Sequence, residues 1–391
     1  MRRVYMDHAA GMPIDPRVFE VMKLYSLKSY GNPSSSHSFG VSAKSVLSES
    51  RERVASLIGA EKPTEVIFTS GGTESNNLAI KGVAYRNKDK GNHIITTAIE
   101  HISIINICKH LQKQGFQVSR IPVDNQGLVD PKKLKDEITD KTILISVMYA
   151  NGEIGTTQPI REIGKIAHES QINFHVDAVA AAGKVPINAE EENIDLLSIS
   201  SNDMYGPKGM GALYIKKGTR VQPVVQGGGQ ERGLRSGTEN IPGIVGMGKA
   251  AEIAQEEMEA EGKHLTKLRD TLIQGVLDTI GSSHLNGHPT NRLPNNANLR
   301  FSYIEGESLI LGLDMVGVQV SSGSACTSKT LEPSHVLLAM GLAHEEAHGS
   351  LVFTMGKQNS EEDVEYVLEV LPGVVKRLRE ISPLTPKEML R

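Results

Sequence analysis

The sequence contains no tryptophan and only two cysteines, Cys108 and Cys326, among its 391 residues. These cysteines lie far apart in dissimilar surroundings, which argues against a disulfide framework and against a zinc site built on cysteines. Long apolar runs are also missing, and the chain begins with a segment that carries the charges of Arg2, Arg3 and Asp7, so we expect neither a signal peptide nor a membrane span. A net charge of only -4 implies no nucleic-acid partner. We therefore expect a cytoplasmic protein.

What is present is a rhythm of alternating elements, in a chain long enough for two domains. Between about residues 65 and 215, short runs of β-branched residues alternate with helical patterns. The runs expected to form strands are 65–69, 93–97, 142–147, 173–177, 195–200 and 211–215. This order predicts βαβ units around a mostly parallel, buried sheet.

A helix rich in Glu and Lys is predicted over about 238–281, separating this sheet region from a second region that begins near His284. The second region carries a strand-like run at 298–302 and two helical patterns. We expect residues 15–258 to form a large α/β domain. Residues 1–14 and 259–391 should form a smaller α+β domain that carries Cys326.

Small and hydroxylated residues, 70–77, follow the first predicted strand and precede a helical pattern. Such a turn lets backbone N–H groups converge on an anion at a helix N-terminus, which favours a phosphate site. A tight turn capped by Ser or Thr is the alternative, and both readings stay open on the residues alone. Neither a Walker lysine spacing nor the dinucleotide fingerprint is present.

The string 68–82 resembles the phosphate loop of NifS/IscS-type cysteine desulfurases, and further blocks of that family follow in order along nearly the whole chain. These blocks are 5–10, 31–35, 100–101, 149–155, 175–178, 205–214, 227–240 and 322–328. The resemblance implies the fold type I of enzymes that use pyridoxal 5′-phosphate (PLP), with a mostly parallel seven-stranded sheet in the large domain. It also implies a homodimer, L-cysteine as substrate and an IscU-like iron–sulfur scaffold protein as partner.

The resemblance also assigns residues to the cofactor. Gly72 and Thr73, with Thr238 of the partner subunit, are similar to the phosphate binders, and His101 is similar to the imidazole that stacks on the ring. Asn151 and Asp177 are similar to the residues that hold the ring hydroxyl and the ring nitrogen. A carboxylate at that nitrogen keeps the ring protonated and therefore an effective electron sink.

Three positions beside the expected lysine depart from the family. Asp203 stands at the position of the lysine that forms the Schiff base, Asn202 replaces its neighbouring histidine, and Ala180 replaces a glutamine that contacts the cofactor. The preceding strand, as in the family, ends at Ser200, which we also expect at the cofactor. A carboxylate cannot form an imine, so we expect that conventional lysine-dependent catalysis has been lost.

Val352 stands where the family has the arginine that clamps the substrate carboxylate, so cysteine binding should be weak. Lys208 follows Asp203 by five residues, and we expect it to serve the backbone turn or solvent. Asp203 should lie near Asp177, and two carboxylates in one pocket repel each other. A metal held with His101 is one resolution; a protonated or water-solvated pair is the reading we prefer.

Cys326 lies in a run of small residues that resembles the loop carrying the family's persulfide-forming nucleophile. Small neighbours suit a thiol that travels between a pocket and a partner. Thiolate is also a soft iron ligand, so Cys326 is predicted to be a persulfide carrier or a ligand of a 2Fe-2S cluster shared with the scaffold. Cys108, in an apolar helical run, is predicted to be core.

His344 and His348 have a spacing that would suit a metal on one helical face, although a solvated polar face is the interpretation we favour. Residues 252–269 likewise predict a solvated helix face. Three hypotheses for function follow. The first is a desulfurase homologue that serves iron–sulfur cluster assembly through Cys326. The second is a slow desulfurase using noncovalently bound PLP, and the third is a regulatory or structural partner of an active homologue.

Overall fold

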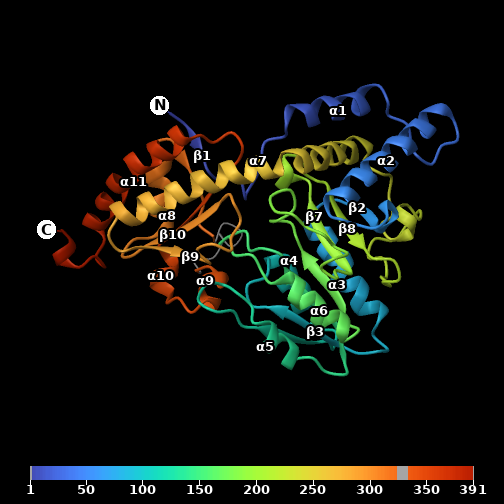
Figure 1. The fold of residues 1–391 in the computed structure, drawn as a ribbon, viewed down its shortest axis with the longest axis horizontal. Coiled ribbons are helices and arrows are strands. Elements are labelled where there is room, and N and C mark those ends of the chain that lie inside the picture. Colours follow the sequence, from blue (N-terminus) through green and yellow to red (C-terminus); the bar gives the residue numbers. More distant parts are fainter. Residues whose placement is uncertain (1, 324–332, 391) are drawn as a thin grey trace.

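A computed structural model describes residues 2–323 and 333–390. Its largest sheet has seven strands (Figure 1). Their order is β2 (Val66–Thr69), β8 (Gly211–Ile215), β7 (Leu196–Ser200), β6 (Asn173–Asp177), β5 (Thr142–Met148), β3 (His93–Thr97) and β4 (Gln117–Ile121). Only the pairings of β8 with β2 and with β7 are antiparallel. The predicted mostly parallel sheet is therefore confirmed.

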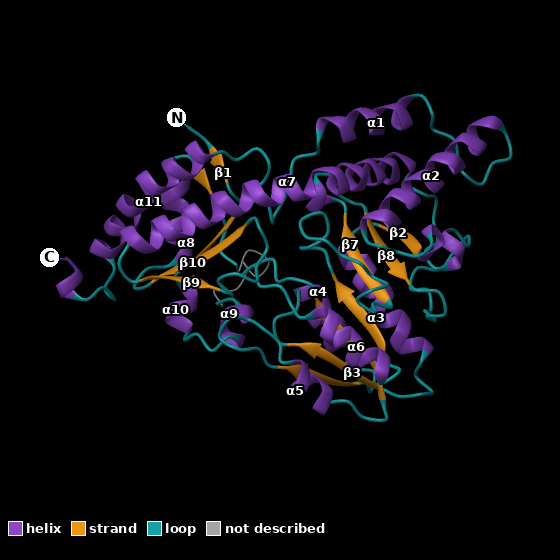
Figure 2. Cartoon of the chain, in the orientation of Figure 1, coloured by secondary structure: helices purple, strands orange, loops and turns teal. Residues whose placement is uncertain are grey.

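Every residue of β3, β5, β7 and β8 is buried, as expected for strands covered on both faces. The covering helices include α3 (Gly72–Arg86), α4 (Ile102–Gln112), α5 (Pro131–Asp136) and α6 (Ile160–Glu169) (Figure 2). Parallel strands in such a sheet bring their carboxyl ends to one edge, where ligands bind in open α/β folds. Asp177 and Ser200 are the last residues of β6 and β7, so they lie at that edge.

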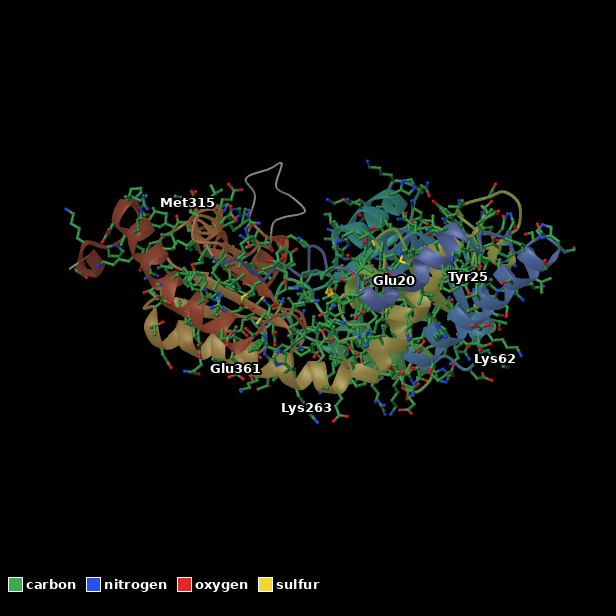
Figure 3. The ribbon with its side chains drawn as sticks, turned by 90° about the horizontal axis from the view of Figure 1, so that it is seen from above. Glu20, Tyr25, Lys62, Lys263, Met315 and Glu361 are labelled. Carbon is green, nitrogen blue, oxygen red and sulfur yellow. The ribbon has the colours of Figure 1, made fainter. Side chains whose placement is uncertain are left out.

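One long helix, α7 (Ile241–Thr279), runs along the length of the molecule (Figure 3). It was predicted over 238–281. Asn240 caps its N-terminus by accepting a hydrogen bond from the Gly243 amide, and proline stands in its first turn, where no intrahelical N–H is needed. Its first half packs against α1 (Pro16–Leu27) and α2 (Ser38–Leu57), and its second half enters a separate core. Because 39 residues rise about 58 Å, the helix reaches from one region to the other.

The second core combines both ends of the chain. A three-stranded antiparallel sheet has the order β12 (Ser350–Thr354), β10 (Asn296–Phe301), β9 (Ser283–Asn286), and β1 (Val4–Tyr5) pairs in parallel with β11 (Val318–Gln319). Four helices accompany these strands in the described residues: α8 (Gly306–Asp314), α9 (His335–Ala339), α10 (His344–His348) and α11 (Glu361–Ile381). An α+β region that includes the N-terminal segment was expected, although with two helices. The domain boundaries at 15 and 258 remain a prediction.

Within residues 2–323 and 333–390, the helices are all too short or too polar to cross a membrane.

Candidate active site

The predicted phosphate turn lies between β2 and α3. Gly71 precedes the helix with φ of 145°, a conformation that favours glycine. A Cβ atom added at Gly72 would lie 2.5 Å from Cγ2 of Val179, so this position also requires glycine, and the turn touches the segment that follows β6. Thr73 is exposed beside it. The turn thus has the shape of an anion cradle at a helix N-terminus.

Asp177 is buried at the end of β6 and is held by two donors. Asn76 Nδ2 donates to its Oδ2 at 2.8 Å, and the Val179 amide donates to its Oδ1 at 3.0 Å. Burial raises the pKa of Asp177, and the attraction of His101 and these hydrogen bonds oppose that rise. A carboxylate held in this way is suited to a ring nitrogen that carries a proton.

His101 is linked to Asp177 through two residues to which sequence analysis gave no role. The Ser103 amide donates to His101 Nδ1 at 3.2 Å, and the Ser103 hydroxyl lies 2.8 Å from the same nitrogen. Asn76 Nδ2, which bonds Asp177, also donates to the Ser103 hydroxyl at 3.1 Å. Since Nδ1 accepts a backbone N–H, a neutral ring carries its proton on Nε2. The network fixes the imidazole relative to the carboxylate.

Asn151 is buried, and its side chain is engaged by the chain itself. Its Nδ2 donates to the Ile99 carbonyl at 2.9 Å, while its Oδ1 accepts from the amides of Glu153 and Ile154. It therefore shapes the wall of the pocket, and its remaining N–H is the only donor of Nδ2 left for a ligand.

Asp203 lies in a short 3₁₀ helix, η2 (Asn202–Met204), that follows β7. Burial raises the pKa of the Asp203 carboxyl, and repulsion from Asp177 adds to that rise. Lys184 and hydrogen bonds from the side chains of Ser200 and Asn202 act in the opposite direction. The repulsion between the two aspartates agrees with their predicted proximity. The side chains of Ser200 and Asn202 lie beside Asp203, and their role at the cofactor stays a prediction.

Lys184 is the cation of this pocket that sequence analysis missed. Its Nζ donates to the backbone carbonyl of Asp203 at 2.9 Å and to that of Ala180 at 3.2 Å. Burial lowers the pKa of Lys184, whereas the charges of Asp203 and Glu261 favour its protonated form. The charge of Lys184 favours the ionised form of Asp203 and so opposes the effect of its repulsion from Asp177.

Val352 and Lys208 are two further residues that the sequence singled out. Val352 is 2% exposed in β12, and its backbone is hydrogen-bonded to the backbone of Ser321. Because its side chain is apolar, it offers no hydrogen bond to a substrate carboxylate. Lys208 is exposed, and its Nζ donates to the Met12 carbonyl at 3.2 Å. Lys208 thus holds the backbone of the N-terminal segment, a contact that the sequence did not predict.

The structure places the remaining candidate residues as follows. Cys326 lies outside the described residues. Thr238 is exposed and precedes α7. Cys108 is buried in α4, where burial raises the pKa of its thiol to about 12, which confirms it as core. His344 and His348 are both exposed on the five-residue α10, in agreement with a solvated face.

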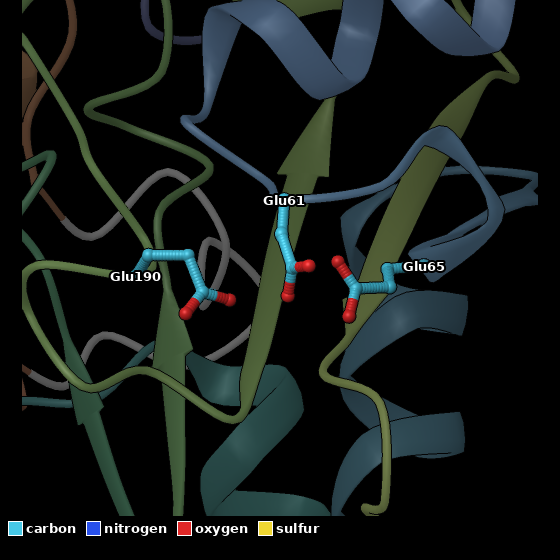
Figure 4. Close-up of side chains that lie close together, drawn as sticks. All are labelled: Glu61, Glu65 and Glu190. Carbon is cyan, nitrogen blue, oxygen red and sulfur yellow. The ribbon is translucent and has the colours of Figure 1, made fainter.

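Three carboxylates, Glu61, Glu65 and Glu190, lie close together (Figure 4). Glu65 directly precedes β2. Glu65 accepts from the backbone amides of Lys62 and Lys217. Glu190 accepts from the hydroxyl of Tyr214 and the ammonium of Lys216. Glu61 is exposed and pairs with the ammonium of Lys62 at 3.1 Å. Each of the three carboxylates therefore has a partner within the chain.

Glu100, beside His101, is fully buried. The Thr97 hydroxyl and the Met148 amide donate to its Oε1 at 2.7 and 3.0 Å, and its backbone carbonyl lies 3.0 Å from His335 Nε2. Burial, reinforced by the charge of Asp177, raises the pKa of Glu100 to about 8. Burial thus favours the neutral form of this carboxyl.

This shift predicts a pH effect on stability. Because the folded chain binds the Glu100 proton more tightly than the unfolded chain, this stabilisation is complete below the ordinary glutamate pKa and is lost as pH rises through about 8. The free energy of unfolding should fall by about 1.4 kcal/mol per pH unit across that window from this group. Urea unfolding between pH 5 and 8.5 should show a shallower decline for Glu100→Gln than for wild type. Parallel profiles would contradict the assignment, and the exposed Glu345→Gln serves as control.

These residues fit PLP in one half of the pocket and not in the other. The glycine turn, His101 and Asp177 have the donors, shape and charge to hold its phosphate and its ring. At the position expected to anchor the cofactor covalently stands Asp203, whose carboxyl interacts with Ser200 and Asn202. The nearby Lys184 is hydrogen-bonded to backbone carbonyls. When bound, the group would supply an electron sink, and this chain's residues would hold it without a covalent bond.

Comparison with known proteins agrees with this geometry. Residues 4–367 match the aminotransferase class-V family. A relative named cysteine desulfurase IscS 1, from Archaeoglobus fulgidus, is 55% identical over 97% of this chain and 99% of its own. A solved NifS-like protein has a TM-score of 0.90 at 38% identity, covering 96% of this chain and 100% of its own. A structure described as SspA in complex with cysteine has a TM-score of 0.80 at 34% identity, covering 91% and 100%. The chain therefore belongs to the class-V aminotransferase family, with the PLP fold type I, and to its IscS- and NifS-like cysteine desulfurases.

Proposed function

We propose that this chain serves iron–sulfur cluster assembly as a desulfurase homologue in which Cys326 carries sulfur, or holds a 2Fe-2S cluster, toward a scaffold protein. The observation that carries the proposal is the environment of Asp203. Its carboxyl interacts with Ser200, Asn202 and Lys184, so the group at the lysine position is integrated into the fold rather than poised to bind an aldehyde. The lysine-dependent chemistry of the family is lost in this proposal, and the sulfur-carrying step is kept.

Transfer of sulfur from a donor persulfide to Cys326 requires no oxidant, because the sulfur moves at an unchanged oxidation level. The Cys326 thiolate attacks the outer sulfur of a donor persulfide, the donor's S–S bond breaks, and the donor leaves as a thiolate while Cys326 gains the persulfide. The experiment is incubation of the purified chain with a small-molecule persulfide. We expect Cys326, and not the buried Cys108, to gain the mass of one sulfur atom in peptide mass spectrometry. A chain that gains none would refute the proposal.

A second candidate is a slow desulfurase that binds PLP noncovalently and converts L-cysteine to L-alanine. The hydrogen-bonded link from His101 through Ser103 and Asn76 to Asp177 favours it, because the ring-binding half of the pocket is assembled. Release of L-alanine from L-cysteine above the rate of free PLP would support this candidate over the first.

The chain is further proposed to act in the cytoplasm as a homodimer. Support for the homodimer comes from exposed apolar side chains on α1, on the turn after it and at the start of α2. These elements lie far from the second core (Figure 1). The exposed side chains are Phe19, Leu24, Leu27, Tyr30, Phe39 and Val41. A surface of this kind marks a protein interface. Light scattering should give twice 42.4 kDa for the wild type. Leu27→Asp with Tyr30→Asp should shift the mass toward one chain, whereas Leu311→Asp with Met315→Asp, at the C-terminal end of α8, should not.

A further inference from the structure

The sheet formed by β12, β10 and β9 turns one face toward the wall of the cofactor-type pocket. Nδ2 of Asn296 and Nδ2 of Asn298 both donate to the Glu153 carbonyl, at 3.1 and 3.0 Å. Glu153 stands two residues after Asn151, so these bonds join β10 to the pocket wall. Because side chains alternate between the two faces of a strand, Arg300 lies on this face together with Asn296 and Asn298.

Val352 belongs to the same face. It pairs with Asn298 across β12 and β10, and directly opposite residues of an antiparallel pair point to the same side. Arg300 lies two residues along β10 from Asn298. Neighbours on that diagonal are about 7–8 Å apart, which is within reach of a long side chain. The chain thus has a cation beside the position where the family has its carboxylate-clamping arginine.

Arg300 itself has few partners. Within residues 2–323 and 333–390, its side chain makes one hydrogen bond, from Nη1 to Asn286 Oδ1 at 2.7 Å, and no ion pair. Its Nε is buried and has no hydrogen-bond partner in the same residues. Burial lowers the pKa of Arg300, while the charge of Glu346 opposes that effect from beyond ion-pair distance. A guanidinium has five N–H groups, so most of those of Arg300 are unused.

Other arginines that the fold buries or partly buries are satisfied by the chain. Arg292 donates from its three nitrogens to five oxygen atoms. Arg379 donates from its three nitrogens to backbone carbonyls, and Arg51 bonds Glu231 through both Nη1 and Nη2. Arg300 differs from these three. A buried donor without a partner is uncommon in native proteins and calls for an explanation.

The guanidinium of Arg300 is held in place by buried amides. Asn286 is 1% exposed, and its Nδ2 donates to Asn298 Oδ1 at 2.8 Å, which leaves its own Oδ1 to accept from Arg300. Asn298 is fixed in turn by its bond to the Glu153 carbonyl. Arg300 is partly exposed and so can meet a solute. A cation fixed in this way loses little freedom when it binds a ligand.

We propose that Arg300 binds the carboxylate of a small amino-acid sulfur donor, in place of the clamp that is lost at Val352. A planar guanidinium takes two carboxylate oxygens in a bidentate fork, and Nε and Nη2 form one such fork. The site rests on the contacts of Arg300, and the role of its ligand as sulfur donor rests on the proposed function. A ligand held there is displaced along β10 from one held at residue 352, so binding at Arg300 should not restore turnover.

The test is isothermal titration of the full chain with L-cysteine and with L-cysteine amide, in which a neutral amide replaces the carboxylate. The wild type is expected to bind L-cysteine about tenfold more tightly, because charge-assisted hydrogen bonds are the stronger ones. Arg300→Met keeps the length without the charge. It should reduce the preference to within about twofold and leave the affinity for the amide unchanged. A wild type without the preference, or a variant that keeps it, would overturn the proposal.

A rescue variant separates binding from a structural role. Val352→Arg added to Arg300→Met returns a guanidinium to the same face and is expected to restore the preference. Absence of rescue would make Arg300 a structural residue instead. Arg377→Met is the matched control, since Arg377 is exposed on α11 and its loss should leave the tenfold preference intact.

Arg300→Lys decides if circular dichroism shows that Arg300→Met does not fold. Lysine keeps the charge but not the fork, so the preference should fall to about threefold. An undiminished preference in Arg300→Lys would then overturn the proposal.

The two proposals fail separately. A chain that takes up no sulfur on Cys326 but prefers L-cysteine through Arg300 would overturn the proposed function alone. A chain that takes up sulfur and binds L-cysteine and its amide equally would overturn the role of Arg300 alone.

Discussion

The double variant Asn202→His with Asp203→Lys is expected to hold PLP through a reducible imine bond to the chain. The wild-type chain is expected to form no such bond. Asp203 has no nitrogen that reacts with an aldehyde, whereas the turn, His101 and Asp177 already fit the phosphate and the ring. Lys184 adds to the effect. A new lysine beside this cation would have its pKa lowered by repulsion, which leaves more of the amine in its neutral, nucleophilic form.

The measurement is borohydride reduction with added PLP, followed by intact mass and the visible spectrum. We expect close to one pyridoxyl group per chain in the double variant. Asn202→His with Asp203→Met is the matched control, because methionine has similar length and no amine. A stoichiometric adduct on wild type, or none on the double variant, would contradict the expectation. Val352 should keep L-cysteine turnover low even when the cofactor is attached, since it provides no charge for the substrate carboxylate.

Replacement of Cys326 by serine is expected to abolish delivery of sulfur to a scaffold protein. A hydroxyl neither forms a persulfide nor binds iron as thiolate does, so cluster formation should fall by more than about tenfold. The absorbance of the cluster formed on an IscU-like scaffold, with a persulfide donor and ferrous iron, provides the measurement.

Cys108→Ser is the control, because it removes the other thiol from a buried site and should leave delivery within about twofold of wild type. Undiminished cluster formation by Cys326→Ser would contradict the sulfur-carrying role. Equal loss in both variants would indicate damage to the fold rather than to the carrier.

The central sheet could be predicted from the sequence because its strands are buried on both faces. The strands 93–97, 173–177 and 211–215 have the predicted bounds, since short runs rich in β-branched and aromatic residues between helical patterns indicate such strands. The strand β4 was missed because it lies at an edge and carries exposed polar residues. The pairing of β1 with β11 joins opposite ends of the chain, which no local pattern reveals.

The candidate site was predictable where residues end strands or stand in family blocks. Asp177, Ser200 and Asp203 are brought together in this way. Lys184 was missed because it reaches Asp203 across two separate turns. A buried side chain such as Asn76 becomes functional only through contacts between α3, α4 and β6, although its place one turn after Gly72 was an available signal.

The long helix α7 has a mechanical consequence. Its first half contributes Ile244, Met247 and Ala251 to one core, and its second half contributes Leu268 and Leu272 to the other. Because α7 is continuous, unfolding of either core would remove the packing of half of this helix and expose its apolar side chains to water. The two cores are thus joined by one helix, and we expect them to unfold together in a single thermal transition.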